Sequence, residues 1–150
     1  MISSAQPIII LLVEDSPDDA FFFRRAVQKS GFATETHVAA DGVEAMDYVL
    51  NKGQFTDAAA YPPPDIIFLD LKLPHCNGFE LLEWMRLHGE RPRTPVVVLS
   101  SSSQTEDQER AEALGAALFL TKPAAPEQLR HVLQKYPVAR LEATGRENSI

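Results

Sequence analysis

Acidic side chains follow two apolar runs that have the composition of buried strands. Glu14 and Asp15 come directly after the run IIILLV, and Asp70 ends the run DIIFLD. A buried carboxylate is costly unless it is paired or bound to a metal, so these acids need a local partner. If the two strands are neighbours in a parallel sheet, the three carboxylates meet at one edge, where Mg²⁺ would balance their charge.

A hydroxyl group and an ammonium group follow the next two apolar runs. Ser100 ends the run PVVVLS, and Lys122 comes shortly after the run AALFL. A carboxylate can attack phosphorus to give an aspartyl phosphate, while a metal ion and a lysine stabilise the phosphoryl oxygens. Asp70 is therefore the candidate nucleophile, and Lys122 and Ser100 are its candidate supporting groups.

The elements that must position these groups alternate along the chain. Four near-continuous apolar runs predict strands covered on both faces, and the alternating segment TETHV predicts an edge strand. The five strands are expected at 8–13, 34–38, 65–70, 95–100 and 116–120. The first helix is expected to open at SPDD with Ser16 as its cap. The other helices are expected near 42–51, 77–88, 104–114 and 125–136. Right-handed crossovers then give an α/β fold with a doubly wound, five-stranded parallel sheet.

The length and composition fit one such domain followed by a tail. We expect a domain over residues 1–136 and a tail over 137–150 that packs against a second subunit in a homodimer. The net charge of -7, from 21 acidic and 14 basic residues, argues against nucleic-acid binding. No apolar stretch reaches the length of a membrane helix, so no membrane partner is expected. The single Cys76 and the lack of a secretory signal predict a cytoplasmic protein.

Together these motifs resemble the receiver domains of two-component response regulators, which are CheY-like. The stretches LLVEDSPDD, IIFLDLKLPHCNGFELL, VVVLSSSS and LFLTKP are similar, in order, to the acidic pocket, phosphoacceptor, switch-hydroxyl and Lys-Pro motifs of that family. The resemblance covers about residues 8–136 and implies a flavodoxin-like (βα)5 fold with strand order 2-1-3-4-5. Within the family, the chain looks most similar to stand-alone regulators paired with phytochrome-type histidine kinases.

The resemblance implies a role for each residue of the acidic site. Glu14, Asp15 and Asp70 would bind Mg²⁺ together with the backbone carbonyl of Lys72. Asp70 would also accept a phosphoryl group from a histidine kinase, and Lys122 would contact that group. The family often has a smaller polar residue at the position of Lys72.

The resemblance also implies a route by which phosphorylation changes the surface. Ser100 would supply the switch hydroxyl, and Phe119 occupies the aromatic switch position. The two residues would couple the phosphoryl group to the surface formed by the helix at 104–114, the strand at 116–120 and the helix at 125–136. Output is then expected through protein contacts or phosphorelay, with no enzymatic turnover beyond the chain's own phosphorylation and dephosphorylation.

The aromatic residues of the first helix separate into two sets on a helical wheel. Phe22, Phe23 and Ala26 share one face, while Phe21 points nearly opposite. We expect Phe22 and Phe23 in the core and Phe21 partly exposed, where it could help to contact a helix of the kinase.

Three other classes of protein are alternatives. A small aspartyl-phosphate phosphohydrolase of the haloacid dehalogenase type has a similar topology, but it needs a second acid where this chain has Lys72. An inactive pseudo-receiver scaffold would not need the acids, hydroxyl and lysine that are present here. A flavin or dinucleotide carrier would need a glycine-rich phosphate loop in place of EDSPDD.

Overall fold

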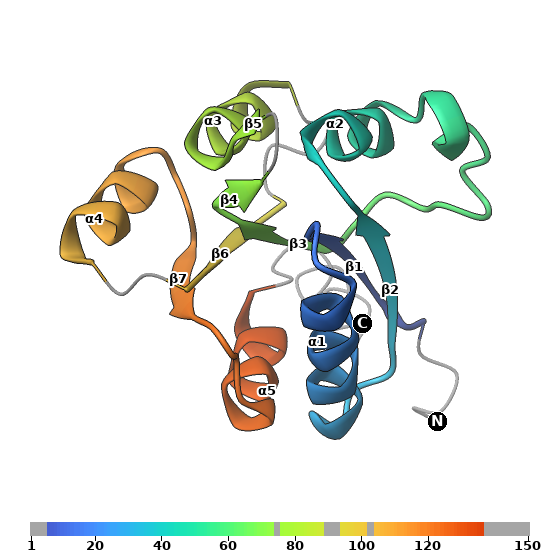
Figure 1. Cartoon of the computed structure of the whole chain (residues 1–150). Helices are drawn as coiled ribbons and strands as arrows, with labels where there is room; N and C mark the ends of the chain where they lie inside the picture. The colour runs from blue at the N-terminus through green and yellow to red at the C-terminus, as the bar shows by residue number, and fades with distance from the viewer. Residues whose placement is uncertain (1–5, 74–75, 89–93, 102–103, 137–150) are drawn as a thin grey trace, which may run out of the picture.

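A parallel sheet forms the centre of the computed structural model, which describes residues 6–73, 76–88, 94–101 and 104–136 (Figure 1). Its strands are β1 (Ile8–Val13), β2 (Thr34–Ala39), β3 (Ile66–Asp70), β6 (Val96–Ser100) and β7 (Leu118–Thr121). They lie in the order β2-β1-β3-β6-β7, and every neighbouring pair is parallel. Counted along the chain within this sheet, the order is 2-1-3-4-5, so the predicted flavodoxin-like topology is confirmed.

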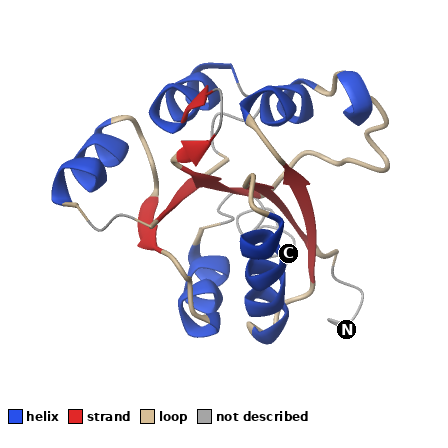
Figure 2. Cartoon of the chain, in the orientation of Figure 1, coloured by secondary structure: helices blue, strands red, loops and turns tan. Residues whose placement is uncertain are grey.

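Helices cover both faces of the sheet (Figures 1 and 2). On one face lie α1 (Pro17–Lys29) and α5 (Pro126–Lys135). On the other lie α2 (Gly42–Leu50), α3 (Gly78–His88) and α4 (Thr105–Ala113). Helix α1 begins within SPDD, as expected, and α2 to α5 each lie within two residues of their expected ranges. The caps and flanking turn residues mark where the apolar periodicity stops.

The sheet divides the core into two layers, which explains the near-continuous apolar runs. Successive side chains of a strand point to opposite faces. In β1, Ile10 and Leu12 pack toward α1 and α5, whereas Leu11 and Val13 pack toward α2 and α3. A strand between two helix layers therefore needs an apolar residue at every position.

The first helix buries a narrower stripe than the sequence indicated. Its buried residues are Ala20, Phe23 and Val27, spaced by three and four positions. Phe22 is 59% exposed and Phe21 is 54% exposed, so the expectation that Phe22 lies in the core is wrong. The helical wheel showed which residues share a face, but it did not show where along that face the sheet and α5 end.

A short antiparallel hairpin that the sequence did not indicate follows β3. It consists of β4 (Lys72–Leu73) and β5 (Cys76–Asn77) and leads directly into α3. Gly78 lies where the chain folds back against itself, because a Cβ atom at this position would lie 2.5 Å from the Cα atom of Leu71. A larger residue at position 78 would therefore push these two backbone segments apart.

The long segment between α2 and β3 is held by an aromatic cluster at the amino end of the sheet. It contains a turn of 3-10 helix, η2 (Gly53–Phe55), whose Phe55 is buried. The Tyr48 hydroxyl donates to the carbonyl of Pro62 at 2.7 Å, and the rings of Phe55 and Tyr61 lie 5.0 Å apart. This segment is a surface elaboration at the amino edge of the sheet, whereas Asp70 lies at the carboxyl edge.

The remaining two expectations concern the tail and the lack of a membrane-spanning helix. The tail at 137–150, expected to form a dimerisation arm, lies outside the described residues. Within the described residues, no helix has both the length and the apolar character that crossing a bilayer requires.

Candidate functional site

Adjacent strands bring the three predicted acids together at the carboxyl edge of the sheet. Val13 of β1 pairs with Leu69 of β3, so the residues that follow these two positions lie side by side. One carboxylate oxygen from each of Glu14, Asp15 and Asp70 lies within 4.8 Å of the others. Glu14 and Asp70 are buried and Asp15 is exposed, so the cluster has one side open to solvent.

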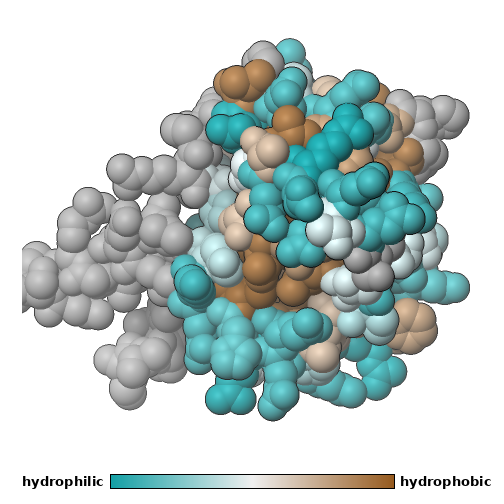
Figure 3. Space-filling view, turned by 90° about the vertical axis from the view of Figure 1, so that its left-hand side faces the viewer, coloured by the Kyte–Doolittle hydropathy of each residue, from teal (hydrophilic) through white to brown (hydrophobic). Residues whose placement is uncertain are grey.

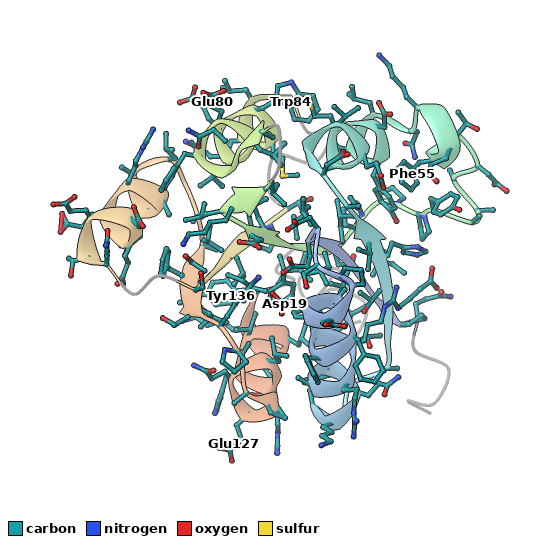
Figure 4. All side chains as sticks on the ribbon, in the orientation of Figure 1. Asp19, Phe55, Glu80, Trp84, Glu127 and Tyr136 are labelled. Carbon is teal, nitrogen blue, oxygen red and sulfur yellow. The ribbon has the colours of Figure 1, made fainter. Side chains whose placement is uncertain are left out.

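Lys122 lies against this cluster and contacts its two buried members. The Nζ atom of Lys122 donates to Glu14 Oε1 at 2.6 Å and to Asp70 Oδ2 at 2.9 Å. A third contact, at 3.0 Å, is made with Asp19 Oδ2 in the first turn of α1 (Figure 4). The backbone N–H of Lys122 donates to the carbonyl of Ser100 at 2.8 Å, which fixes the end of β7 beside the end of β6.

Backbone donors orient the buried carboxylates from their other sides. The N–H of Lys72 donates to Asp70 Oδ1 at 3.0 Å. The N–H of Ser16, the cap of α1, donates to Glu14 Oε2 at 3.1 Å. Each buried carboxylate therefore has one oxygen bonded to the backbone and the other bonded to Lys122, which holds it in a single orientation.

The burial and hydrogen bonds of this network shift the pKa values of Glu14 and Lys122. Desolvation by burial raises the pKa of Glu14, and the nearby charge of Asp70 adds to that effect, despite hydrogen bonds from Lys122 and Ser16 that oppose it. Burial also favours the neutral amine of Lys122. Its hydrogen bonds to Asp70, Glu14 and Asp19 outweigh that effect, so the pKa of Lys122 is raised and the amine is an ammonium at neutral pH.

The donor set and the charge balance both fit a hard divalent cation. Three carboxylates, those of Glu14, Asp19 and Asp70, contact the ammonium of Lys122, and the carboxylate of Asp15 lies beside those of Glu14 and Asp70. These five groups carry a formal charge of four negative and one positive, or -3. Carboxylate oxygens are ligands that Mg²⁺ prefers, and one or two of them usually bind it together with waters. The acids predicted to bind the metal are thus placed where they could do so.

The two predicted switch residues lie on β6, which neighbours the strand of Asp70, and on β7, which lies beyond β6. Ser100 is buried at the end of β6, one residue after Leu99, which pairs with Asp70. Phe119 of β7 is partly buried and packs against the core layer that contains α3 and α4. The roles of both residues, and that of the Lys72 carbonyl, stay predictions.

Asp19 is a site residue that sequence reasoning missed. An acid at its position in SPDD is accounted for by the positive end of the helix, because acids are common in first turns. The sequence signal that could have found it is its distance of about one helical turn from the pair Glu14 and Asp15. That spacing alone does not show which way the side chain turns.

Comparison with known proteins assigns the family. Residues 10–134 match the response regulator receiver domain, which is most of the chain. The chain belongs to the response regulator receiver family. This receiver domain is 32% identical over 131 residues to the response regulator Rcp1 of Synechocystis sp. (strain ATCC 27184 / PCC 6803 / Kazusa), an alignment that covers 87% of each protein.

Solved structures of regulators from phytochrome systems share its fold. The bacteriophytochrome response regulator AtBRR is 35% identical, with a TM-score of 0.76 over 88% of this receiver domain and 94% of that chain. The phosphorylated cyanobacterial phytochrome response regulator RcpA is 33% identical, with a TM-score of 0.72 over 86% and 90% of the two chains. The receiver domain is therefore similar to stand-alone, CheY-like regulators, as its motifs indicated.

Proposed function

We propose that this protein is a single-domain response regulator that accepts a phosphoryl group on Asp70 from a histidine kinase in a Mg²⁺-dependent reaction. The observation that supports this most directly is the Asp70 carboxylate, buried at a strand end between the backbone N–H of Lys72 and the ammonium of Lys122. The same carboxylate belongs to a cluster of oxygens suited to a divalent cation.

In the proposed reaction, a carboxylate oxygen of Asp70 attacks the phosphorus of a phosphohistidine. An O–P bond forms and the P–N bond breaks, so the electron pair stays on the imidazole nitrogen and Asp70 becomes an acyl phosphate. With acetyl phosphate as donor, a P–O bond breaks instead and acetate leaves. The ammonium of Lys122 is placed to stabilise the negative charge on the transferred phosphoryl oxygens.

Glu14, Asp15 and Asp70, together with the backbone carbonyl of Lys72, are the groups proposed to hold Mg²⁺. When bound, this ion supplies positive charge that neutralises the phosphoryl oxygens. Two similar proteins support the assignment, since one structure of Rcp1 is described as Mn²⁺-bound and the RcpA structure is described as phosphorylated.

The proposed output is a change of surface at α4, β7 and α5. Ser100 at the end of β6 would bond the new phosphoryl group, and Phe119 would respond by changing its packing. Figure 3 views this side of the molecule and shows apolar residues between more polar surfaces above and below. Such a surface can bind a protein partner, which agrees with output through protein contacts and without nucleic acid.

The proposed partners are a phytochrome-type histidine kinase and a second copy of the chain. The first is supported by the similarity to AtBRR and RcpA. For the homodimer we propose contacts through the tail at 137–150 or through the face of α4, β7 and α5. The cytoplasmic location expected from the sequence is part of the same proposal, as is the absence of turnover of external phosphate esters.

The test is phosphorylation of the full chain with acetyl phosphate and Mg²⁺, followed by intact-protein mass spectrometry and size-exclusion chromatography with light scattering. We expect one phosphoryl group per chain, none after Asp70→Asn and none in EDTA. The matched control is Asp18→Asn, which removes an exposed carboxylate of α1 and should leave the phosphorylation intact.

Three results would contradict the proposal. Phosphorylation of the Asp70→Asn variant would show that another residue is the acceptor. Steady release of phosphate from simple phosphate esters would favour the phosphohydrolase. Failure of the parent protein to bind Mg²⁺ would favour the pseudo-receiver scaffold.

A further inference from the structure

We propose that Asp19 is a positioning residue that holds the ammonium of Lys122 in place for the phosphoryl group, an inference that rests on the proposed phosphorylation of Asp70. Figure 4 shows Asp19 at the start of α1, close to the carboxyl ends of the strands. Its Oδ2 atom lies 3.0 Å from Lys122 Nζ, although the two residues belong to opposite ends of the domain in sequence.

The local structure of α1 does not account for the orientation of the Asp19 side chain. Asp19 is three residues after the cap Ser16, a position from which an acidic side chain commonly accepts a bond from the backbone N–H of the cap. Here that N–H donates to Glu14 Oε2 at 3.1 Å. The Ser16 hydroxyl accepts from the Asp19 N–H at 3.2 Å, so the helix end is capped without the Asp19 carboxylate. That carboxylate instead crosses to Lys122.

Asp19 differs from the other two acceptors of Lys122 in what happens to it during the reaction. An ammonium has three N–H groups, and here they face Glu14, Asp70 and Asp19. Asp70 becomes an acyl phosphate, and both Asp70 and Glu14 are proposed metal ligands. Asp19 is thus the acceptor whose bond to Lys122 can persist while the bonds on the other side are exchanged for a bond to the phosphoryl group.

The open space around Lys122 explains what its bond to Asp19 would do. Asp19 and Lys122 line a pocket of about 310 Å³ whose other walls are mostly apolar, including Phe22, Phe23 and Pro123. A lysine side chain with open space beside it has many rotamers available, and confining it costs entropy. A carboxylate that binds the ammonium beforehand reduces that cost at the moment of phosphoryl transfer.

The test measures the rate of phosphorylation of the full chain by acetyl phosphate at saturating Mg²⁺, over a range of donor concentrations. We expect Asp19→Ala to lower the rate constant at saturating donor by about tenfold, since a displacement of about 1 Å can cost up to about a hundredfold. Asp19→Asn, which keeps the shape of the side chain, should lower it less but measurably. Thermal unfolding of each variant checks that it is folded.

The matched control is Asp18→Ala, which removes the same charge from the same exposed turn of α1. Both alanine variants reduce the repulsion of an anionic donor, so both should lower the half-saturating donor concentration slightly. The loss of rate at saturation should be specific to Asp19→Ala.

A double-mutant cycle with Lys122→Ala separates positioning from other effects, because a residue that acts through Lys122 has nothing to position once that side chain is removed. In the Lys122→Ala background, we expect Asp19→Ala to cause no further loss in the rate constant at saturating donor. Because this background reacts more slowly, its phosphorylation is followed over longer times. An equal loss in both backgrounds, or identical behaviour of Asp19→Ala and Asp18→Ala, would overturn the inference while leaving the phosphorylation of Asp70 intact. If the parent protein is not phosphorylated on Asp70, both the proposed function and this inference are wrong.

Discussion

Glu14 is suited to binding a metal ion, but its buried charge lowers the stability of the metal-free protein. It supplies a carboxylate to the cluster that we propose binds Mg²⁺, but it is buried beside Asp70. Burial raises the pKa of Glu14, which means that the folded, metal-free protein favours the uncharged form more than the unfolded chain does. The charge that suits Glu14 to the metal therefore destabilises the protein when the metal is absent.

Glu14→Gln should consequently stabilise the metal-free protein at pH 7 and weaken Mg²⁺ binding by at least about tenfold, or roughly 1.4 kcal/mol. Because the folded pKa is raised, the stability linked to Glu14 is fully present below its ordinary pKa and is lost as the pH rises through the folded value. In EDTA, the variant should lack this part of the pH dependence. Urea unfolding in EDTA and in Mg²⁺ at several pH values measures both effects.

Glu83→Gln is the control for this comparison, because Glu83 is exposed on α3. It should change neither the stability in EDTA nor the binding of Mg²⁺. A metal-free Glu14→Gln variant that is less stable than the parent would show that the bond with Lys122 outweighs the burial of the charge.

At the scale of residues, the sequence predicts where the acids and the lysine lie, because each follows a recognisable strand. The position of Asp70 at the end of an apolar run was enough to require a partner for its charge. Asp19 could not be assigned in the same way, since an acid in the first turn of a helix is stabilised by the helix dipole alone. Only the structure shows that Glu14 bonds the cap and leaves Asp19 directed at Lys122.

At the scale of elements, two arginine side chains link α3 and α4. Arg86 of α3 donates to the carbonyl of Leu114 at 2.9 Å, and Arg110 of α4 stacks over the ring of Phe79 with its Cζ atom 4.1 Å from the ring centroid. Gly115 follows α4 with a φ of +101°, and a Cβ atom there would lie 2.2 Å from Arg86 Cδ. The close approach of Arg86 thus depends on a glycine at position 115.

Gly115→Ala should therefore destabilise the protein more than Gly31→Ala does. Gly31 has a similar φ of +93°, but a Cβ atom there would meet nothing within 4 Å. Gly31→Ala reports backbone strain alone, about 1 to 2 kcal/mol. Gly115→Ala should cost about 1 kcal/mol more, because it also displaces Arg86 from its hydrogen bond.

Urea unfolding measures both glycine variants, and the comparison is repeated in an Arg86→Ala background. There, the difference between the two variants should shrink toward zero. Equal costs in the parent background would show that Arg86 moves aside without loss.

The sequence predicts some helices and strands better than others, because they differ in length and in how they are covered by other elements. The central strands carry apolar residues at every position because both faces are covered, and this pattern survives in the sequence. β4 and β5 have two residues each, too few to show a periodicity. The exposure of Phe22 depends on where α1 meets the sheet and α5, which is a property of the packed elements.

At the scale of the whole molecule, exposed aromatic residues lie close to the proposed phosphorylation site. Phe21 and Phe22 are both exposed on α1, and Phe22 also lines the pocket beside Lys122. A kinase that delivers a phosphoryl group to Asp70 must approach this edge of the sheet. We therefore keep the proposal that Phe21 contacts a helix of the kinase.

Phe21→Ala should slow phosphoryl transfer from a kinase by about tenfold, in keeping with the roughly 1 to 2 kcal/mol that a contributing aromatic side chain supplies at an interface. It should leave phosphorylation by acetyl phosphate unchanged, because that donor needs no docking surface. The measurement uses an autophosphorylated phytochrome-type histidine kinase that phosphorylates the parent protein.

The control is Val43→Ala, which removes another exposed apolar side chain, on α2 and on the opposite face of the sheet. It should affect neither donor. If Phe21→Ala slows both donors equally, the residue supports the site itself and is no part of a docking surface.

The segment between α2 and β3 offers a place to attach a reporter to this protein. Its residues 56–60 are exposed and lie at the amino end of the sheet, remote from Asp70. A fluorophore coupled to an Ala58→Cys variant would leave the proposed phosphorylation site untouched. The native Cys76 would compete poorly for the reagent, since burial raises the pKa of its thiol and keeps it protonated. Dye-labelled protein could then report binding to a kinase in real time.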